Sequence, residues 1–441
     1  MVPTELGHVV EDIHRLSGGG ADRTDEIVVE DILQRLLTWL DRHGLASYDY
    51  ADILRSRLVR RLTFASPFAQ RVAIQFGKHF PLNIRPLIGI TPHVSSQTLA
   101  LLCSARAWQC AAGLPGVTVE TLHQTAQALL DDRLEDGTNA LWGLKLHIAT
   151  RFVQATPTTP NLFQTSNAIH ALLDTFQVTG KDVYALAANE AVISSVERLG
   201  LVVDDGTRGG GIFCRYYPGM ETPVYNVNAL LAAASWRLRN LAIGGVQAHG
   251  ERAESLLRFV LGGQRPDGAW PYASHPSGQW VDGYHTGYLL EALGYLRHPA
   301  VDAPVEAALE RGASYFRGRL MDADGCPKYF DNSRYPIDVQ NCAQAIQTIA
   351  RLQPLGGLDM PLLRRAVSCA VRELFLPDAE GGGYFAATRR RLFVNHTPYV
   401  RWGQAPMALA LTLAWNAQHG GDGYFRSGTD RSVGTHDSGA A

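Results

Sequence analysis

The stretch Asp267-Gly-Ala-Trp-Pro-Tyr272 is one copy of a glycine loop, followed by aromatic residues, that occurs four times in the chain. The other copies are Gly209-Gly-Gly-Ile-Phe-Cys-Arg-Tyr-Tyr217, Asp324-Gly-Cys-Pro-Lys-Tyr-Phe330 and Gly381-Gly-Gly-Tyr-Phe385. Successive loop glycines, at positions 211, 268, 325 and 382, are each 57 residues apart. A fixed period indicates one structural unit used repeatedly, and it takes precedence over local predictions of secondary structure.

Each period contains two runs whose apolar residues recur at three- and four-residue steps, which predicts a pair of antiparallel helices. The first run is apolar almost all round, as in 229–234 and 405–411, whereas the second carries Arg and Glu on one face. An all-round apolar helix is buried, and an amphipathic helix faces solvent. This segregation into an inner and an outer layer favours a closed toroid over an open solenoid. The sequence therefore predicts an all-α fold, an (α/α)6-type toroid of about six hairpins.

The predicted inner helices span 225–241, 284–296, 338–352 and 401–414, with earlier ones at 91–112 and 165–176. The predicted outer helices span 252–261, 305–320 and 362–376. Gly137 lies 74 residues before Gly211, so the unit that it begins carries an insertion. We expect the toroid over residues 79–425 and an N-terminal helical extension over 1–78, with helices at 27–41 and 48–64. Residues 426–441 are rich in Gly, Ser, Thr and Asp, which predicts a disordered tail.

Composition limits the partners and cofactors that the chain is expected to have. The net charge is −2 with no basic or acidic run, which argues against nucleic acid and anionic membrane surfaces as partners. No apolar segment reaches about 18 residues and no signal core is present, so we expect a cytoplasmic protein without a membrane span. Six scattered cysteines without a Cys-x-x-Cys pair predict reduced core residues. No metal-ligand spacing or P-loop occurs, so no metal or other cofactor is expected, and the oligomeric state stays open.

Polar and aromatic residues stand at the predicted starts of several inner helices. Because inner helices of a toroid converge on a central cavity, their N-terminal ends bring such residues together, and free N–H groups there favour an anionic ligand. The candidates at helix starts are Asn167, Tyr225, Asn226, Asn228, Asp282, Tyr284, His285, Asp338, Gln340, Tyr399, Arg401, Trp402 and Gln404. The glycine loops add Arg215, Tyr217 and Trp270.

Plainer structural roles compete with a functional one for many of these residues. Helix capping alone explains a set of four, namely Asp282, Asp338, Asn226 and Asn228. The aromatic residues Tyr272 and Tyr329 of the glycine loops could serve only to pack one repeat against the next. His285 could be a buried histidine whose ring nitrogens are satisfied by hydrogen bonds within the core. An unpaired buried arginine is costly, so we expect Arg401 to meet a carboxylate, either from the protein or from a ligand.

The candidate set combines aromatic faces, amide side chains, histidine, tyrosine, arginine and a few carboxylates. Aromatic faces stack on pyranose rings, and polar side chains bind hydroxyl groups or a uronate carboxylate. This mixture predicts a saccharide as the ligand.

Several ordered motifs carry a resemblance to a known group of proteins. They include Trp142-Gly143, residues 157–165, Tyr225-Asn-Val-Asn228, residues 264–270, 280–288 and 335–340, and Pro398-Tyr-Val-Arg-Trp-Gly-Gln404. From about Asn83 to Trp415 the chain resembles α/α-toroid proteins of bacterial exopolysaccharide biosynthesis clusters, often labelled squalene-cyclase-like. The resemblance implies a toroid and a link to polysaccharide biosynthesis. A departure is Gln340-Asn341, where a His-Ser-like pair is expected, so no role rests on a histidine there.

A wider similarity is to toroid enzymes that act on uronates, namely polysaccharide lyases and glucuronyl C5-epimerases. It implies abstraction of the C5 proton, with Arg401 and Asn226 neutralising the carboxylate and stabilising the enolate. His285 would be the base, and Tyr284 or Tyr399 the acid or a second base.

Three other functions stay open at this point. A glycoside hydrolase would need two acids flanking one bond, such as Asp282 and Asp338. A terpenoid-cyclase-like enzyme shares the toroid, but the chain lacks the Asp-x-Asp-Asp cluster of those enzymes. A non-catalytic glycan-binding component of a synthesis complex would bind sugar through its aromatic residues without reaction, so whether the protein is an enzyme is itself undecided.

Overall fold

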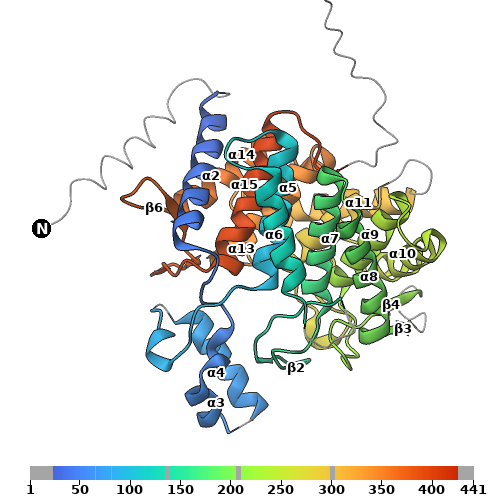
Figure 1. Cartoon of the computed structure of the whole chain (residues 1–441), viewed down its shortest axis with the longest axis horizontal. Coiled ribbons are helices and arrows are strands. Elements are labelled where there is room, and N and C mark those ends of the chain that lie inside the picture. The colour runs from blue at the N-terminus through green and yellow to red at the C-terminus, as the bar shows by residue number, and fades with distance from the viewer. Residues whose placement is uncertain are drawn as a thin grey trace, which may run out of the picture.

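The computed structural model of the chain describes residues 23–64, 66–80, 82–134, 140–204, 210–297 and 303–425 (Figure 1). The expected tail at 426–441 and the loop glycine Gly137 lie outside these residues. Among the described residues, no helix is long and apolar enough to cross a membrane.

A closed ring of six helices forms the centre of the described structure. Each helix packs against the next, and the last packs against the first. The ring consists of α5 (Ser96–Ala112), α7 (Leu162–Thr179), α9 (Tyr225–Asn240), α11 (Gly283–Tyr295), α13 (Val339–Leu352) and α15 (Ala405–Gln418). Nearly every side chain of α9 and α13 is buried, as all-round apolar helices require.

A second layer of helices surrounds this ring and is amphipathic. Five of its members follow their inner partners in the chain: α6 (Val119–Asp131), α8 (Asp182–Leu199), α10 (Val246–Gly262), α12 (Ala303–Tyr315) and α14 (Met360–Leu374). The sixth position is taken by α2 (Arg23–His43), which packs against α15 from the opposite end of the chain. The predicted fold class, an (α/α)6-type toroid, is confirmed.

The glycine loops owe their period to close packing against the outer helices. Gly211, Gly268 and Gly325 have φ values of +99°, +92° and +80°, a region that favours glycine. A Cβ on Gly268 would lie 2.4 Å from the backbone oxygen of Arg311 in α12. In the fourth copy the positive φ falls on Gly381. The loops of Gly211, Gly268 and Gly325 can therefore lie against their outer helices only when glycine stands at this position, whereas a Cβ on Gly381 would meet no atom within 4 Å.

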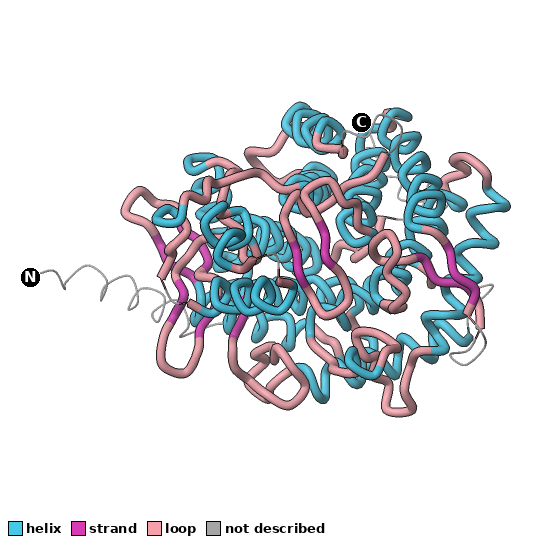
Figure 2. Tube along the Cα trace, turned by 90° about the horizontal axis from the view of Figure 1, so that it is seen from below, coloured by secondary structure: helices cyan, strands magenta, loops and turns pink. Residues whose placement is uncertain are grey.

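Short antiparallel strands lie in the connections between helices (Figure 2). The two-stranded pairs are β1 (Ile148–Ala149) with β2 (Gln154–Ala155), β3 (Leu201–Val203) with β4 (Ile212–Cys214), and β6 (Phe375–Pro377) with β7 (Gly383–Phe385). A three-stranded sheet consists of β5 (Ile337–Asp338), β8 (Thr388–Arg389) and β9 (Val394–Asn395) in that order. In the first pair, Ile148 stands opposite Ala155.

Residues 44–90, here called the N-terminal lobe, form a separate projection below the toroid in Figure 1. The lobe contains η1 (Asp52–Arg55), α3 (Arg57–Leu62), α4 (Pro67–His79) and η2 (Pro86–Ile88). The single helix predicted at 48–64 is wrong, because Ser56 caps a new helix after η1. A small core that includes Ile53, Ile74 and Ala149 of β1 joins the lobe to the toroid.

The structure corrects the expectation that all six cysteines are reduced. Cys326 and Cys369 form a disulfide, with their sulfur atoms 2.15 Å apart. The pair is separated by 43 residues in the sequence, so no local motif marks it. The loop of Gly325 packs against Arg365 of α14, and this contact brings the two cysteines together.

Candidate functional site

A cavity of about 1290 Å³ opens at the N-terminal ends of the inner helices. Its wall includes Gln97 of α5, Gln164 of α7, His285 of α11 and Gln340 of α13. Arg401 comes from η6 (Val400–Gln404), a π-helical turn that leads into α15. The N-terminal lobe and the turn between β1 and β2 complete the wall. This is the end of the toroid at which the sequence places its unusual polar residues.

His285 lines the cavity in an orientation fixed by Asp282, the N-cap of α11. One carboxylate oxygen of Asp282 accepts a hydrogen bond from the backbone N–H of His285 at 2.9 Å. The other oxygen lies 2.7 Å from His285 Nδ1 and accepts from Trp280 Nε1 at 3.1 Å. Because a carboxylate only accepts, Nδ1 of the neutral imidazole carries the proton and Nε2 keeps its lone pair. His285 is therefore arranged as a proton acceptor.

An aromatic wall lies beside His285. The rings of Tyr272 and Trp280 stack with centroids 4.7 Å apart and an interplanar angle of 11°. The Tyr284 ring lies 4.3 Å from the imidazole of His285, and its hydroxyl oxygen is 3.4 Å from that of Tyr329. Burial raises the pKa of Tyr284 well above its ordinary value, so its hydroxyl keeps its proton at neutral pH.

Arg401 forms a buried ion pair with Asp49 of the N-terminal lobe. Its Nη2 donates to Asp49 Oδ1 at 2.7 Å, its Nε donates to the other carboxylate oxygen, and its Nη1 donates to Gln97 Oε1 at 2.9 Å. Burial alone would raise the pKa of Asp49, but the charge and hydrogen bonds of Arg401 lower it to about 2. The expectation that Arg401 meets a carboxylate is confirmed, and the carboxylate belongs to the protein.

Asp338 is buried behind the cavity wall as the N-cap of α13. Its carboxylate accepts hydrogen bonds from the backbone N–H of Asn341 and from Trp402 Nε1, both at 3.1 Å. Burial raises the pKa of Asp338 to about 6. The Trp402 ring lines the cavity and stacks on Tyr50 of the lobe at 4.7 Å. Asp338 therefore positions an aromatic wall residue and does not itself face the cavity.

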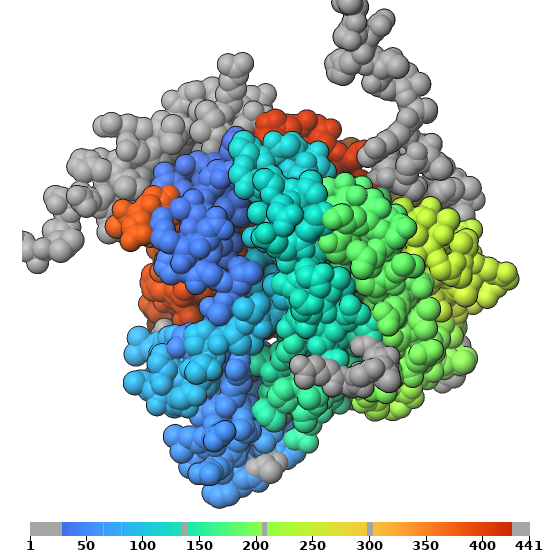
Figure 3. Space-filling model, viewed as in Figure 1, coloured from blue at the N-terminus to red at the C-terminus, as the bar shows by residue number. Residues whose placement is uncertain are grey.

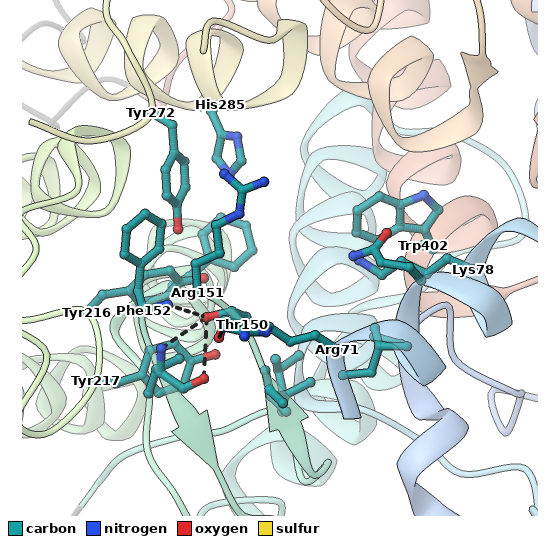
Figure 4. A pocket seen from close by; sticks show the side chains of 18 of the residues that line it. Arg71, Lys78, Thr150, Arg151, Phe152, Tyr216, Tyr217, Tyr272, His285 and Trp402 are labelled. Atoms are coloured by element: carbon teal, nitrogen blue, oxygen red, sulfur yellow. Dashed lines mark hydrogen bonds between the residues drawn. The ribbon is translucent and has the colours of Figure 1, made fainter. Parts of the chain in front are cut away.

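Three further cations line the cavity without a carboxylate partner among the described residues. Arg71 Nη1 donates to the backbone oxygen of Thr150 at 3.4 Å, and Lys78 Nζ lies 5.1 Å from the Tyr50 ring centroid. Burial, followed by the charge of Arg401, lowers the pKa of Lys78. Figure 4 shows Arg151 reaching from the β1–β2 turn toward His285. No Asp or Glu stands among the described residues that line the cavity.

Six of the candidate residues line this cavity: His285, Tyr284, Arg401, Tyr217, Gln340 and Trp402. Gln340 Nε2 donates to the hydroxyl of Tyr288 at 2.5 Å. The Tyr217 hydroxyl accepts from Asn161 Nδ2 at 3.2 Å, and burial raises the pKa of Tyr217 to about 12.

The other candidates lie outside the lining, and most of them hold the framework. The capping explanation holds for Asp282 and Asp338, whereas Asn228 binds the backbone N–H and carbonyl of Cys214. Trp270, predicted to bind substrate, is instead buried, and its Nε1 donates to the carbonyl of Val260 at 2.8 Å. Gln404 forms hydrogen bonds with the backbone of Phe385, and Asn167 donates one to the carbonyl of Phe163. Arg215 forms a hydrogen bond with Glu221, and the ring of Tyr225 stacks on that of Phe259. Asn226 and Tyr399 are buried.

The cations of the lobe and of the β1–β2 turn were not among the candidates. Arg71, Lys78 and Arg151 lie outside the repeats, so the period gives no position for them. For Arg71 and Lys78 the sequence held one indication, because residues 53–119 contain no Asp or Glu; Arg151 lies outside this stretch. A long acid-free stretch marks a region where cations have few local partners.

Comparisons with solved structures find the same fold at low sequence identity. The Lin0763 protein from Listeria innocua matches 89% of this chain and 99% of its own, with a TM-score of 0.60 and 12% identity. A GH76 α-mannanase of Bacteroides thetaiotaomicron matches 74% and 87%, with a TM-score of 0.52 and 12% identity. A cellobiose 2-epimerase of Bacillus thermoamylovorans matches 72% and 87%, with a TM-score of 0.52 and 10% identity.

No protein-family model matches the sequence, and no curated protein matches it. At identities of 10–12% the structural likeness establishes the architecture. The chain has the α/α-toroid fold that it shares with the mannanase and the epimerase.

Proposed function

We propose that the protein is an enzyme that acts on an anionic saccharide and abstracts the proton at C5 of a uronate, giving epimerisation or β-elimination. The observation that carries this proposal is a histidine that a buried aspartate orients toward the cavity. The described residues that line this cavity include several cations and no Asp or Glu. Such a lining favours a negatively charged ligand over a neutral one.

His285 supplies the base in this proposal. Its Nε2 takes the C5 proton, and the electron pair of the broken C–H bond moves into the carboxylate to form an enediolate. Cations beside the carboxylate stabilise the charge that develops, and such electrostatic stabilisation is often the largest contribution to catalysis. Asp282 stabilises the imidazolium form of His285 that results.

Arg151 is the better candidate for the carboxylate contact than Arg401, because Arg401 is already paired with Asp49. The Arg151 side chain points toward His285 in Figure 4 and has no ion pair with another described residue. Arg71 and Lys78 extend the positive wall. Asn226, assigned a carboxylate contact from the sequence, is outside the lining and has no part in the proposed site.

Tyr284 completes the reaction as the acid. Its raised pKa keeps the hydroxyl protonated, and its ring lies next to that of His285. Because Tyr284 lies on the same side as His285, it can protonate the oxygen that leaves C4, whereas the epimer requires a proton returned to C5 from solvent on the opposite face. Loss of the substituent at C4 from the enediolate, with the electron pair forming the C4–C5 double bond, gives the unsaturated product of a lyase.

The comparisons support a saccharide as the substrate, because the structural neighbours include an enzyme named as a mannanase and one named as a cellobiose epimerase. The sequence resemblance to exopolysaccharide-cluster proteins supports a role in polysaccharide biosynthesis. A glycoside hydrolase is less favoured, since Asp282 and Asp338 are both buried caps outside the cavity lining.

The test is solvent exchange. The protein is incubated in deuterated water with polymers, oligosaccharides and nucleotide sugars that contain glucuronate, galacturonate or mannuronate. We expect deuterium at C5 or an unsaturated product with at least one of them, and loss of either signal in His285→Ala but not in His419→Ala, an exposed histidine outside the cavity. Binding without exchange would overturn the catalytic proposal and favour a glycan-binding component. Cleavage of a neutral glycan would favour a hydrolase.

A further inference from the structure

The N-terminal lobe exposes an unusual number of large apolar side chains. They are Leu58 (54% exposed), Leu62 (63%), Phe64 (85%), Phe68 (68%), Val72 (53%), Phe76 (53%), Leu82 (68%) and Leu87 (85%). Leu58 and Leu62 stand four residues apart on α3, and Phe68, Val72 and Phe76 stand four apart on α4. Residues at this spacing share one side of a helix. Each short helix therefore presents an apolar side to solvent, and such patches mark interaction surfaces.

The lobe is also strongly basic. Residues 53–88 contain seven Arg and Lys and no Asp or Glu, whereas the whole chain has a net charge of −2. The remainder of the chain consequently carries a net charge of −9. Arg85 is neutralised by buried Asp52 at 2.6 Å, but Arg57 and Arg61 are exposed and have no ion pair with a described residue. The net charge of the whole chain argued against anionic membranes as partners. That single value does not show that basic residues are concentrated in the lobe.

The apolar side of α4 continues into the cavity. Phe68, Val72 and Phe76 belong both to the exposed apolar set and to the cavity lining. In the space-filling view the lobe projects beyond the toroid, so its tip can meet a flat surface before the rest of the molecule does (Figure 3). Whatever covers this face therefore also covers the cavity mouth.

We propose that the N-terminal lobe docks on an anionic lipid bilayer. The exposed leucines and phenylalanines enter the interface, and Arg57 and Arg61 pair with lipid phosphates. Short amphipathic helices that combine Lys or Arg with Leu and Phe bind membranes in this way. A second copy of the chain is the less suitable occupant, because a two-fold contact would bring two acid-free basic surfaces together.

The test measures binding of the full-length protein to vesicles by flotation. Vesicles of equal parts phosphatidylglycerol and phosphatidylcholine should bind the protein, pure phosphatidylcholine should bind it far less, and added salt should weaken binding. Arg57→Gln with Arg61→Gln should lower the partition coefficient about fivefold per arginine. Leu58→Ser with Leu62→Ser should lower it about tenfold or more. None of these four residues lines the cavity.

The matched control is Val183→Ser with Leu186→Ser, which removes two exposed apolar side chains from α8 on the toroid. This variant should bind vesicles as the unchanged protein does. Absence of binding to anionic vesicles, or equal losses in the control and lobe variants, would overturn the proposal. A change of molecular mass in the leucine variant, measured by light scattering, would identify a second copy as the occupant. Because no readout involves catalysis, failure here is distinguishable from failure of the proposed reaction.

Discussion

Asp282→Asn isolates the chemistry of His285 from the architecture around it. Asparagine caps a helix about as well as aspartate, so the start of α11 is retained at a cost of well under about 1 kcal/mol. In the orientation that keeps the cap, the side-chain oxygen accepts from the backbone N–H of His285. The amide nitrogen then takes the place of the oxygen that now lies 2.7 Å from His285 Nδ1. It is a donor, so Nδ1 must accept and the proton moves to Nε2.

The variant consequently presents an N–H group where the reaction needs a lone pair. General base catalysis contributes about 10²–10⁴-fold to a rate, so we expect kcat for C5 exchange to fall by that factor, or about 3–5 kcal/mol of barrier. The KM should also rise, as in the control variant below, because the amide nitrogen no longer accepts from Trp280 Nε1 and this cavity-lining ring is loosened. The assay is deuterium incorporation at C5, with kcat and KM measured separately over a range of pH.

Asp338→Asn is the matched control. Asp338 is also a buried N-cap whose carboxylate accepts from a tryptophan Nε1, but it contacts no histidine. The same exchange of oxygen for nitrogen there should loosen Trp402 and raise the KM more than it lowers kcat. If Asp282→Asn keeps kcat within about threefold, or if both variants lose kcat equally, the proposed role of the His285–Asp282 pair is refuted.

Three further predictions concern charge. Arg151→Gln should raise the KM for a uronate substrate about tenfold without changing the melting temperature, because Arg151 has no described ion pair; an unchanged KM would exclude it from the carboxylate site. Arg401→Met leaves buried Asp49 without its partner, so it should lower the free energy of unfolding by about 3–5 kcal/mol in a denaturant titration. Arg215→Met, which breaks the exposed ion pair with Glu221, should lower it by under about 1 kcal/mol in the same titration. Burial lowers the pKa of His170 to about 3, so below pH 6.5 the unfolded chain binds more protons than the folded protein does. Between pH 6.5 and 4.5, the free energy of unfolding of the unchanged protein should therefore fall by about 2–3 kcal/mol more than that of His170→Gln. Parallel profiles of stability against pH for the two proteins would contradict this prediction.

The architecture could be predicted because its period has a local cause. In three of the four loops, a glycine at the left-handed position lets the backbone approach the outer helix, as at Gly268 beside Arg311. The layer to which each helix belongs is likewise encoded in its own apolar pattern. The completion of the outer layer by α2 has no such local signal, since it depends on a contact between the two ends of the chain. The disulfide between Cys326 and Cys369 depends on tertiary packing in the same way.

The candidate site could be predicted only where the repeat supplies it. Tyr284, His285, Gln340, Arg401 and Trp402 come from helix starts that the period locates, and they line one cavity. Residue type alone could not show which of the polar residues at helix starts cap a helix, which bind the backbone of a neighbouring segment and which line the cavity. The answer depends on the direction in which each side chain points, and the sequence does not give that direction. The cations escaped prediction because the lobe and the β1–β2 turn have no counterpart in the other repeats.

The lobe also links the two proposals physically. It contributes Lys78 and Arg71 to the cavity, and it is joined to the toroid by the Asp49–Arg401 pair and by Tyr50 stacked on Trp402. Buried ion pairs and stacked rings depend strongly on geometry, so a small shift of the lobe must move part of the cavity wall. Binding of the lobe to a bilayer would therefore act directly on the site. In the proposed reaction, a uronate held at the membrane surface would meet the mouth of the cavity without diffusing through bulk solvent.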